Sequence, residues 1–386
     1  MHLQPHAPLA PRTTLEVGGP ADLLVVADDA TTLAAAVTLA RDEHDGVLHL
    51  LGHGSNVVIS DEGLRGVTVV LSGGGVEDVT PQDGATLVRA GGGMRWDDLV
   101  AWSVDAGLAG IELLSGIPGT VGAAPVQNIG AYGQALDETF VALTALDCDR
   151  GELVTLDGQA CAFGYRDSRF KRDWRDRFGI VEVTLALRSE PDGPLSYRDL
   201  ERHFAEHGGE PDDLAARRQA VLAVRRAKSM VWDPDDPLSR SAGSFFMSPW
   251  LPRARAVELV DGVRGAGAGE RLFAWYSAGA AETVKVPAAL ILLAAGFGNG
   301  DRWGRVGLSP RHVLALVNHG GARAQEVADV AAHITETVRR RLGVELRAEP
   351  RFLGAFRPFD PEAFAARAPY TPGGAATPAW ARESTH

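Results

Sequence analysis

The chain has 386 residues, more than one hydrophobic core usually supports, so we expect two or three domains. Hydrophobic residues make up 45% of the sequence and charged residues 23%, which is the mix of a globular protein rather than a disordered one. The net charge of -12 argues against a nucleic-acid partner, because phosphate backbones require a concentrated basic surface. An anionic small molecule needs only a local positive pocket and is compatible with this charge.

The sequence shows no targeting or membrane segment. Residues 1–5 lack the charged-then-apolar pattern of a secretory signal. The best apolar run, residues 286–295, is shorter than the roughly 20 residues of a membrane helix and contains Pro287. Cys148 and Cys161 are expected to be two buried thiols, because a chain this long needs no disulfide, and a single disulfide between them is the alternative. We therefore expect a cytoplasmic protein without a membrane partner.

Residues 1–74 are predicted to form a small unit of alternating strands and helices. Residues 21–26 form a compact apolar run, and Asp28 or Asp29 can cap a following helix that carries Leu33, Val37 and Ala40. Further strands are predicted at residues 47–51, 57–59 and 67–71.

Residues 75–229 are predicted to form a second, strand-rich unit. It opens with a strand at 86–90 and a helix from Trp96, which Gly107 can end. A polar helix at 214–228 closes the unit, and between them strands are predicted at 141–147, 153–156 and 180–187.

Residues 230–343 are predicted to form a third unit, whose clearest element is a helix over 324–342. Val327, Val330 and Ile334 recur at helical spacing, and Gly343 follows the last helical residue. After Pro358 the composition turns to Ala, Pro, Thr and Gly, so we expect residues 358–386 to be a disordered tail.

Two glycine-rich loops have the composition expected around a phosphate-bearing cofactor. The first, residues 51–56, joins two predicted strands. Its glycines let backbone amides approach a pyrophosphate, and Ser55 and Asn56 add hydrogen-bonding side chains. It lacks the spacing of a dinucleotide-binding turn, so a plain tight turn is an equal alternative. The second loop, residues 116–133, surrounds a few polar groups with many small residues, as expected where backbone wraps an extended cofactor.

The segment 116–133 resembles the flavin-binding signature of UDP-N-acetylenolpyruvoylglucosamine reductases, and the loop at 54–56 is similar to their other one. The resemblance runs from about Thr13 to Gly354, and further matches follow in family order at 163–168, 195–197, 241–246 and 349–352. It implies an α+β (mixed α/β) fold. The two-part FAD-binding body, of the PCMH/vanillyl-alcohol-oxidase type, would comprise residues 1–74 and 75–229, the latter with a return segment at 344–357. Residues 230–343 would be a C-terminal α+β substrate domain.

The resemblance also implies non-covalent FAD, NADPH as reductant, and a monomer that acts in peptidoglycan precursor synthesis. The substrate would be a UDP-sugar enolpyruvyl ether, UDP-N-acetylglucosamine enolpyruvate, and the product UDP-N-acetylmuramate. Hydride would pass from NADPH to the flavin N5 and then to the vinyl carbon. The residues carried over as cofactor-binding are Gly52, Gly54, Ser55, Asn56, Gly116, Pro118, Gly119, Gly122, Ala123, Gln127, Asn128, Gly130, Ala131, Tyr132 and Gly133.

The implied reaction creates an enolate beside a carboxylate, so it needs a cation there and an acid that protonates the neighbouring carbon. Arg166 suits the first role because a guanidinium binds a carboxylate bidentately, although a structural pair with Asp167 is the alternative. The resemblance implies Glu349 as the acidic partner, for which a salt bridge with a neighbouring arginine is the alternative. It implies Ser244 as the proton donor, although a serine in this small-residue turn could simply form the turn.

Tyr197 and Lys228 match family positions that contact the nucleotide sugar, and Tyr276 matches the lid tyrosine of one subgroup. Two departures from the family pattern bear on a substrate or NADPH contact. Ser248 stands where the family usually has Asn, so one hydroxyl replaces an amide that donates and accepts. Residues 287–290 depart from the usual Ala-Ala-Trp-Leu pattern.

Two motifs suggest other functions. Residues 203–207 fit the H-x-x-E-H spacing of some zinc proteases, but two glycines follow and no third ligand is evident, so we expect a solvated connector and no metal. His53 lies in a glycine-rich loop, as in oxidases that attach FAD covalently. An FAD-dependent oxidase is therefore the alternative enzyme, and a flavin-storage protein is the alternative without catalysis.

Overall fold

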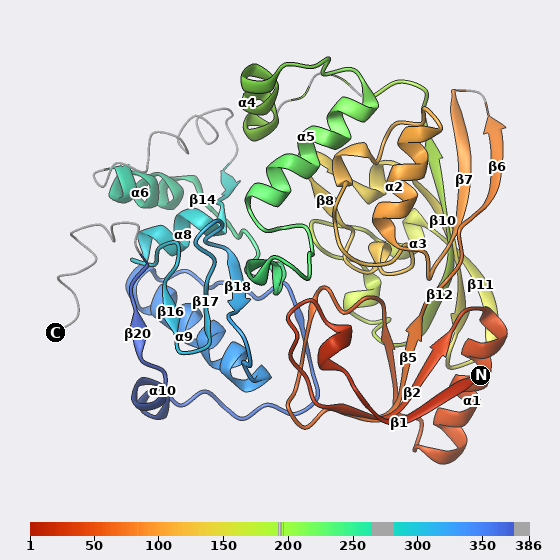
Figure 1. Ribbon diagram of the computed structural model, residues 1–386, viewed down its shortest axis with the longest axis horizontal. Coiled ribbons are helices and arrows are strands. Elements are labelled where there is room, and N and C mark those ends of the chain that lie inside the picture. The colour runs from red at the N-terminus through yellow and green to blue at the C-terminus, as the bar shows by residue number, and fades with distance from the viewer. Residues whose placement is uncertain (83, 192, 194, 196, 265–281, 374–386) are drawn as a thin grey trace. The chain divides into compact units, whose positions relative to one another are not determined.

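The computed structural model describes the chain except residues 83, 192, 194, 196, 265–281 and 374–386 (Figure 1). Its internal contacts divide the chain into two compact units. Unit 1 comprises Met1–Arg12, Gly19–Ser55 and Glu62–Trp232. Unit 2 comprises Thr13–Gly18, Asn56–Asp61 and Asp233–His386.

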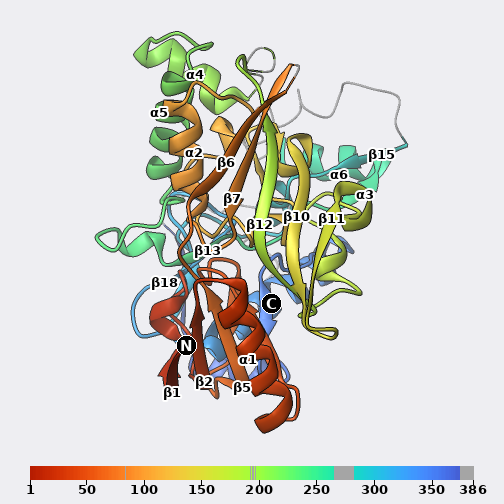
Figure 2. The same cartoon turned by 90° about the vertical axis from the view of Figure 1, so that its right-hand side faces the viewer.

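The first sheet of unit 1 has the strand order β1-β2-β5-β3, with helix α1 (Ala30–Glu43) along it (Figure 2). Strand β1 pairs antiparallel with β2, and the other neighbours are parallel. Asp29 caps α1 by accepting a hydrogen bond from the Thr32 amide, as predicted. The predicted strands are confirmed as β2 (Pro20–Ala27), β3 (Leu48–Leu51) and β5 (Leu64–Leu71). Strand β1 (His2–Pro8) was not predicted, because its two prolines and largely exposed side chains give no strand pattern.

The second sheet of unit 1 is antiparallel, with the order β11-β10-β12-β7-β6. Helix α2 (Trp96–Asp105) buries Trp96, Leu99 and Val100 in one core with residues of this sheet. Helices α3 (Gly158–Cys161), α4 (Arg198–His207) and α5 (Leu214–Ala227) complete the unit. The strands are β6 (Val76–Gln82), β7 (Ala85–Gly91), β10 (Phe140–Asp147), β11 (Glu152–Asp157) and β12 (Phe178–Leu187).

Unit 2 is built around a sheet of order β13-β18-β17-β16-β20. The predicted helix is confirmed as α9 (Ala324–Leu342), and its apolar face lies in the same core as α8 (Ala288–Ala294). Helix α6 (Arg253–Arg264) and the pair β14 (Trp250–Pro252) and β15 (Thr283–Lys285) also belong to this unit. The sheet strands are β13 (Ser241–Ser244), β16 (Arg302–Trp303), β17 (Val306–Leu308), β18 (Ala315–Asn318) and β20 (Tyr370–Thr371).

The return segment at residues 344–357 belongs to unit 2, which corrects its predicted place in the FAD-binding body. Strand β19 (Arg351–Leu353) pairs parallel with β4 (Val57–Ile59), a strand that the sequence placed in the first domain. Val344 and Leu346 are buried in the core of unit 2. Three-residue strands carry too short a pattern to indicate which unit they join.

The predicted disordered tail is corrected over residues 358–373. Helix α10 (Pro361–Arg367) is capped by Asp360, and Phe364 is 4% exposed with its ring stacked on His333 at 4.9 Å. The Tyr370 hydroxyl donates to the buried Asp301 carboxylate at 3.1 Å, and β20 extends the sheet beside β16. A few aromatic anchors thus outweigh a composition typical of disorder. Residues 374–386 lie outside the described part of the chain.

The expectation of two buried thiols is confirmed, since Cys148 and Cys161 are both free and buried. Burial raises the pKa of Cys161 to about 12, so this thiol is a poor nucleophile. No helix in the described residues is long and apolar enough to cross a membrane.

The packing of Phe364 predicts that the C-terminal segment stabilises unit 2. Truncating a buried phenylalanine to alanine typically costs about 3–5 kcal/mol. Phe364→Ala should therefore lower the midpoint of urea-induced unfolding, whereas Glu362→Gln, an exposed change in the same helix, should shift the free energy by less than about 0.5 kcal/mol. Equal midpoints for both variants would show that the segment contributes nothing to stability.

Candidate functional site

The two glycine-rich loops meet within unit 1. The Ser55 hydroxyl donates to the Pro118 carbonyl at 2.9 Å. A Cβ added to Gly52 would lie 3.0 Å from both Thr120 Oγ1 and the Cβ of Ala123, closer than ordinary packing allows. A Cβ on Gly122 would lie 2.6 Å from the Ile180 carbonyl oxygen. The two loops, some 60 residues apart in the chain, therefore lie in close contact, and small residues at such a contact suit an extended diphosphate cofactor such as FAD.

The second half of the signature forms a short hairpin. Strands β8 (Gly130–Ala131) and β9 (Gln134–Ala135) pair antiparallel, with Tyr132 and Gly133 at the tip, both at positive φ. All residues predicted to bind the cofactor lie in unit 1 except Asn56, which lies in unit 2.

This hairpin segment holds the Arg166 side chain. The Arg166 guanidinium donates to the main-chain carbonyls of Asn128, at 3.4 Å, and Gly130. The Asn128 side chain supports the same arrangement, because its amide donates to the Gly164 carbonyl at 3.1 Å. Asp167, the alternative partner, instead pairs with Arg172 at 3.5 Å. The cation expected at the substrate carboxylate is thus oriented by backbone of the flavin signature.

A buried ion pair anchors the same hairpin. Glu112 in the short helix η2 (Glu112–Leu114) and Arg217 in α5 lie 3.3 Å apart, with side chains 0% and 1% exposed. Gln134 bridges to the hairpin: its amide nitrogen donates to Glu112 at 3.0 Å, and its oxygen accepts from the Leu113 amide at 2.8 Å. This network was not predicted, because an isolated Glu, Gln or Arg in a sequence carries no sign of burial.

The predicted nucleotide-sugar contacts lie near the hairpin tip. The Tyr197 ring meets the Tyr132 ring edge-on, with centroids 5.0 Å apart. Lys228 forms an ion pair with Asp199, so its ammonium already has a counter-charge. Burial raises the pKa of Tyr132 to about 12, so its hydroxyl stays a neutral donor at all ordinary pH values.

Arg225 is a cation in this region that the sequence analysis missed. Its guanidinium donates to the carbonyls of Gly116, at 3.1 Å, and Met230, at 2.7 Å. Burial lowers its pKa, an effect opposed by the neighbouring Tyr132 and Asp97. The only sequence signal was a basic doublet, Arg225-Arg226, at the end of a predicted helix.

Unit 2 brings together Ser244, Glu349 and Asn56. Ser244 follows an irregularity in the pairing of β13 with β18. The next residue, Phe245, accepts a hydrogen bond from the Glu349 amide at 2.8 Å. The Asn56 side chain donates to the Glu349 carbonyl at 3.5 Å, and the Asn56 carbonyl accepts from the Arg351 amide at 3.0 Å.

His312 joins this cluster and was also missed. Its Nε2 lies 3.1 Å from Ser244 Oγ. The two residues are 68 positions apart, so nothing local in the sequence connects them. His312 lies shortly before β18, a strand that the sequence analysis did not predict.

Two further predicted contacts have different outcomes. The Ser248 hydroxyl accepts a hydrogen bond from the Ala288 amide at 3.2 Å, so it supports the start of α8. Tyr276 lies outside the described residues.

The H-x-x-E-H motif lies on α4, where the rings of His203 and His207 stack at 4.5 Å. In the part of the chain that the structure describes, no group of three His, Cys, Asp or Glu side chains could hold a metal ion. His53 is partly buried, and burial together with Arg95 lowers its pKa, which favours the neutral imidazole.

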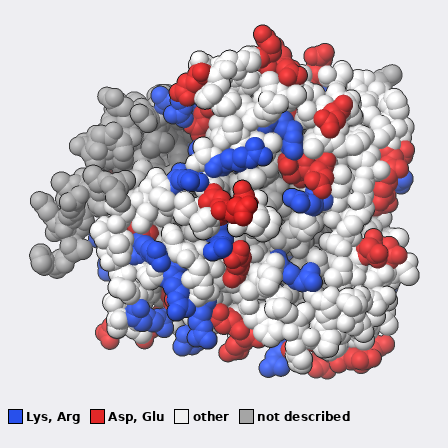
Figure 3. Space-filling view, in the orientation of Figure 1, with Lys and Arg blue, Asp and Glu red and all other residues white. Residues whose placement is uncertain are grey.

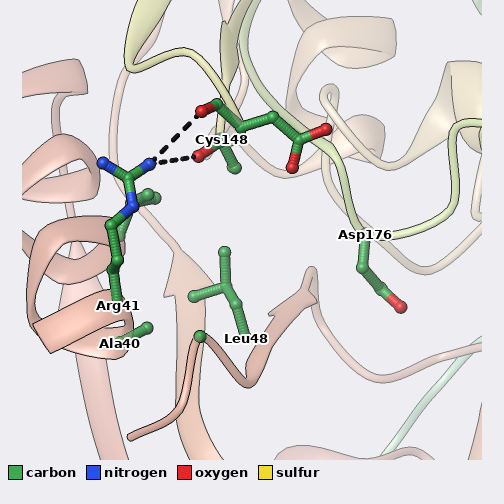
Figure 4. Close-up of a pocket in the computed structure, with 8 residues that line it drawn as sticks. Ala40, Arg41, Leu48, Cys148 and Asp176 are labelled. Carbon is green, nitrogen blue, oxygen red and sulfur yellow. Dashed lines mark hydrogen bonds between the residues drawn. The ribbon is translucent and has the colours of Figure 1, made fainter. Parts of the chain in front are cut away.

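A separate pocket of unit 1 contains none of the predicted site residues (Figure 4). Arg41 lines one side of it and donates to the carbonyls of Cys148, at 3.2 Å, and Asp149, at 3.4 Å. Burial raises the pKa of Cys148 to about 11, so this thiol is a poor nucleophile. The pocket is lined by Val37, Ala40, Arg41, Gly46, Leu48, Cys148, Asp149 and Asp176.

The surface shown in Figure 3 carries charges of both signs, with acidic side chains among the basic ones over much of the face. Such mixing is typical of an ordinary protein surface and lacks the single-sign field that concentrates polyanions. The expected absence of a nucleic-acid partner stays a prediction.

Family models match most of the chain. An FAD binding domain matches residues 21–157, and the C-terminal domain of UDP-N-acetylenolpyruvoylglucosamine reductase matches residues 234–353. The chain therefore carries an FAD-binding domain, in agreement with the loop geometry of unit 1.

Proteins named UDP-N-acetylenolpyruvoylglucosamine reductase align over nearly the whole chain. The protein from Thermobifida fusca is 40% identical over 353 residues, covering 90% of this chain and 97% of its own length. The protein from Nocardia farcinica is 42% identical over 354 residues, covering 90% and 88%. The crystal structure of the Thermus caldophilus enzyme superposes with a TM-score of 0.57 at 23% identity, covering 92% of this chain and 98% of that one, which supports the predicted fold. This chain belongs to the UDP-N-acetylenolpyruvoylglucosamine reductase family.

Proposed function

We propose that this chain is an FAD-dependent oxidoreductase that reduces UDP-N-acetylglucosamine enolpyruvate to UDP-N-acetylmuramate with NADPH, a step of peptidoglycan precursor synthesis. Family membership over 90% of the chain supports this activity. The observation that carries it is the position of Arg166, whose guanidinium is held by carbonyls of the flavin signature itself. A cation fixed there is what an enolate formed beside the cofactor requires.

The small residues of the two loops would hold FAD, which when bound supplies the hydride acceptor and donor of the reaction. A side chain on Gly52 would crowd Thr120 and Ala123, so glycine suits the place where the two loops meet. Arg166 would bind the substrate carboxylate bidentately and stabilise the negative charge that develops as hydride adds to the vinyl carbon.

Ser244 would then supply the proton to the carbon next to the carboxylate. A serine hydroxyl is a weak acid, so its surroundings must assist it. Glu349 lies within the same cluster of unit 2, and we propose that it bonds the enolate side or orients the charged groups there. Tyr197, Lys228, Tyr276 and Ser248 are proposed contacts of the nucleotide sugar.

The same proposal includes domain roles and a cellular setting. Unit 1 would bind FAD, and residues 230–343 would bind substrate. We further propose a cytoplasmic monomer, and a reaction between two small water-soluble molecules, a nucleotide sugar and NADPH, needs neither a membrane nor a nucleic acid.

An anaerobic titration tests the activity directly. NADPH should bleach the yellow flavin, and UDP-N-acetylglucosamine enolpyruvate should restore the colour with formation of one product per flavin. A flavin-storage protein would show tight FAD binding without bleaching by NADPH. An oxidase would be reoxidised by oxygen and indifferent to the enol ether.

The mode of flavin attachment separates the proposal from the oxidase alternative. Acid denaturation should release all of the yellow colour into the supernatant, because the backbone of residues 52–55 and 116–133 would hold FAD by non-covalent contacts. Colour retained by the precipitated chain, together with loss of that retention in His53→Ala, would establish a covalent histidyl flavin and refute the prediction.

Arg166 and Ser244 should act in the second half-reaction only. Removing a well-placed donor typically slows the chemical step by about 10²–10³-fold. Ser244→Ala should leave flavin reduction by NADPH nearly intact and slow reoxidation by the enol ether. Arg166→Ala should also weaken substrate binding, because the ground-state carboxylate already meets the guanidinium.

Stopped-flow absorbance of the flavin separates the two half-reactions. Arg175→Ala is the matched control for Arg166, because this exposed arginine belongs to the same basic run and donates to the Lys171 carbonyl. If Ser244→Ala slowed only the NADPH step, Ser244 would position the reductant and would not be the acid.

A further inference from the structure

The hydrogen bond between His312 and Ser244 has no role in the function proposed above. Within unit 2, His312 Nε2 and Ser244 Oγ lie 3.1 Å apart, and both residues are partly buried. The distance fits a normal hydrogen bond, and either atom could be the donor, depending on which imidazole nitrogen carries the hydrogen.

The backbone around both residues fixes this contact. Ser244 is the residue of β13 opposite Ala315 of β18, and the following Phe245 amide donates to the Leu314 carbonyl at 2.7 Å. The loop that carries His312 is closed by its own bonds, since the Ala315 amide donates to the His312 carbonyl at 3.0 Å. The two side chains therefore meet because strand pairing holds their backbones close together.

The direction of this hydrogen bond decides whether Ser244 can act as an acid. A serine hydroxyl has one hydrogen to donate and two lone pairs that accept. If Ser244 donated to His312, its only proton would point at the imidazole and away from any substrate. If Nε2 carries the hydrogen and donates to Oγ, the serine proton is free to point elsewhere, and the oxygen is stabilised as it loses that proton.

We propose that His312 is a positioning residue for proton transfer, which donates from Nε2 to Ser244 Oγ and thereby keeps the serine proton available to the substrate carbon. This inference rests on the proposed function, because it assigns His312 to the protonation step of the same reaction. In that step the Ser244 O–H bond breaks and a C–H bond forms with the electron pair left by hydride addition. Water returns a proton to Oγ after the product leaves.

The residue before His312 helps to fix the loop that carries it. Arg311 precedes it in the chain, and its guanidinium pairs with Asp236 at 3.1 Å. The amide of Arg311 donates to the Ser309 hydroxyl at 3.2 Å, which further shapes the loop.

Three single variants test the inference by stopped-flow measurement of both half-reactions. His312→Leu removes the donor and should slow reoxidation by the enol ether about 10²-fold, while flavin reduction by NADPH stays at the wild-type rate. His312→Gln can place an amide N–H near the position of Nε2, so it should recover most of the lost rate. His319→Leu is the matched control: this partly buried histidine follows β18 in the same unit, and its loss should leave both rates unchanged.

A double variant distinguishes positioning from general damage. If His312 acts only through Ser244, the variant Ser244→Ala with His312→Leu should reoxidise no more slowly than Ser244→Ala alone. The solvent deuterium isotope effect on reoxidation should rise in His312→Leu, because proton transfer then limits the rate. If His312 had a merely structural role, the losses in the double variant would multiply, and the solvent isotope effect would keep its wild-type value.

Three results would overturn the inference: a wild-type reoxidation rate in His312→Leu, losses that multiply in the double variant, or equal slowing of the NADPH step. If His312→Leu fails to retain FAD, His312→Gln takes its place in the comparison with Ser244→Ala. Losses that multiply in the double variant Ser244→Ala with His312→Gln would then reject the role of His312 equally. Failure of the wild-type protein to be reoxidised by the enol ether would instead reject the proposed function, and the inference with it.

Discussion

The candidate site of unit 1 depends on one buried ion pair, Glu112 with Arg217. Both side chains are almost fully removed from water, which is costly unless every remaining polar atom is satisfied. Glu112 meets that condition, because it also accepts hydrogen bonds from the Gly110 amide at 2.8 Å and from the Gln134 side chain at 3.0 Å. Removing one partner of such a pair typically costs about 3–5 kcal/mol, because the other charge is left buried and unpaired.

The ion pair matters for function because hydrogen bonds connect it to the hairpin that holds Arg166. Gln134 connects Glu112 to the hairpin of β8 and β9, and in this hairpin the Gly130 carbonyl accepts from Arg166. In an antiparallel pair, hydrogen-bonded and non-hydrogen-bonded positions alternate along the strands. The Leu136 amide donates to the Ile129 carbonyl, so the adjacent Gly130 carbonyl faces outward, where a guanidinium can reach it. Arg217 of helix α5 thus helps to position Arg166, because Glu112, Gln134 and the backbone of the hairpin connect the two arginines.

The elements that sequence predicted well are those whose signal is local. Helix α9 and the Asp29 cap follow from hydrophobic spacing and a single capping side chain. Strands β1 and β6 were not predicted, because both contain proline and most of their side chains are exposed. Their sequences therefore show no alternation of apolar and polar residues. Residues 344–357 and the segment around Phe364 were misplaced for another reason: their contacts are with residues far away in the chain. The types of residue at the site were predictable from motifs, whereas the partners that orient them, His312 and Gln134, were not.

The partners also explain why Arg166 and Lys228 are not equivalent cations. Lys228 is paired with the Asp199 carboxylate. Burial raises the pKa of Asp199, but the hydrogen bond and the charge of Lys228 outweigh this effect, so the pKa is lowered and the carboxylate stays a counter-charge to the ammonium. A diphosphate that approaches Lys228 must compete with Asp199 for it. In the hairpin segment Arg166 is oriented by main-chain carbonyls, which accept hydrogen bonds from its guanidinium at fixed positions. The hairpin therefore fixes the direction of a guanidinium, and a directed donor is what a developing enolate requires.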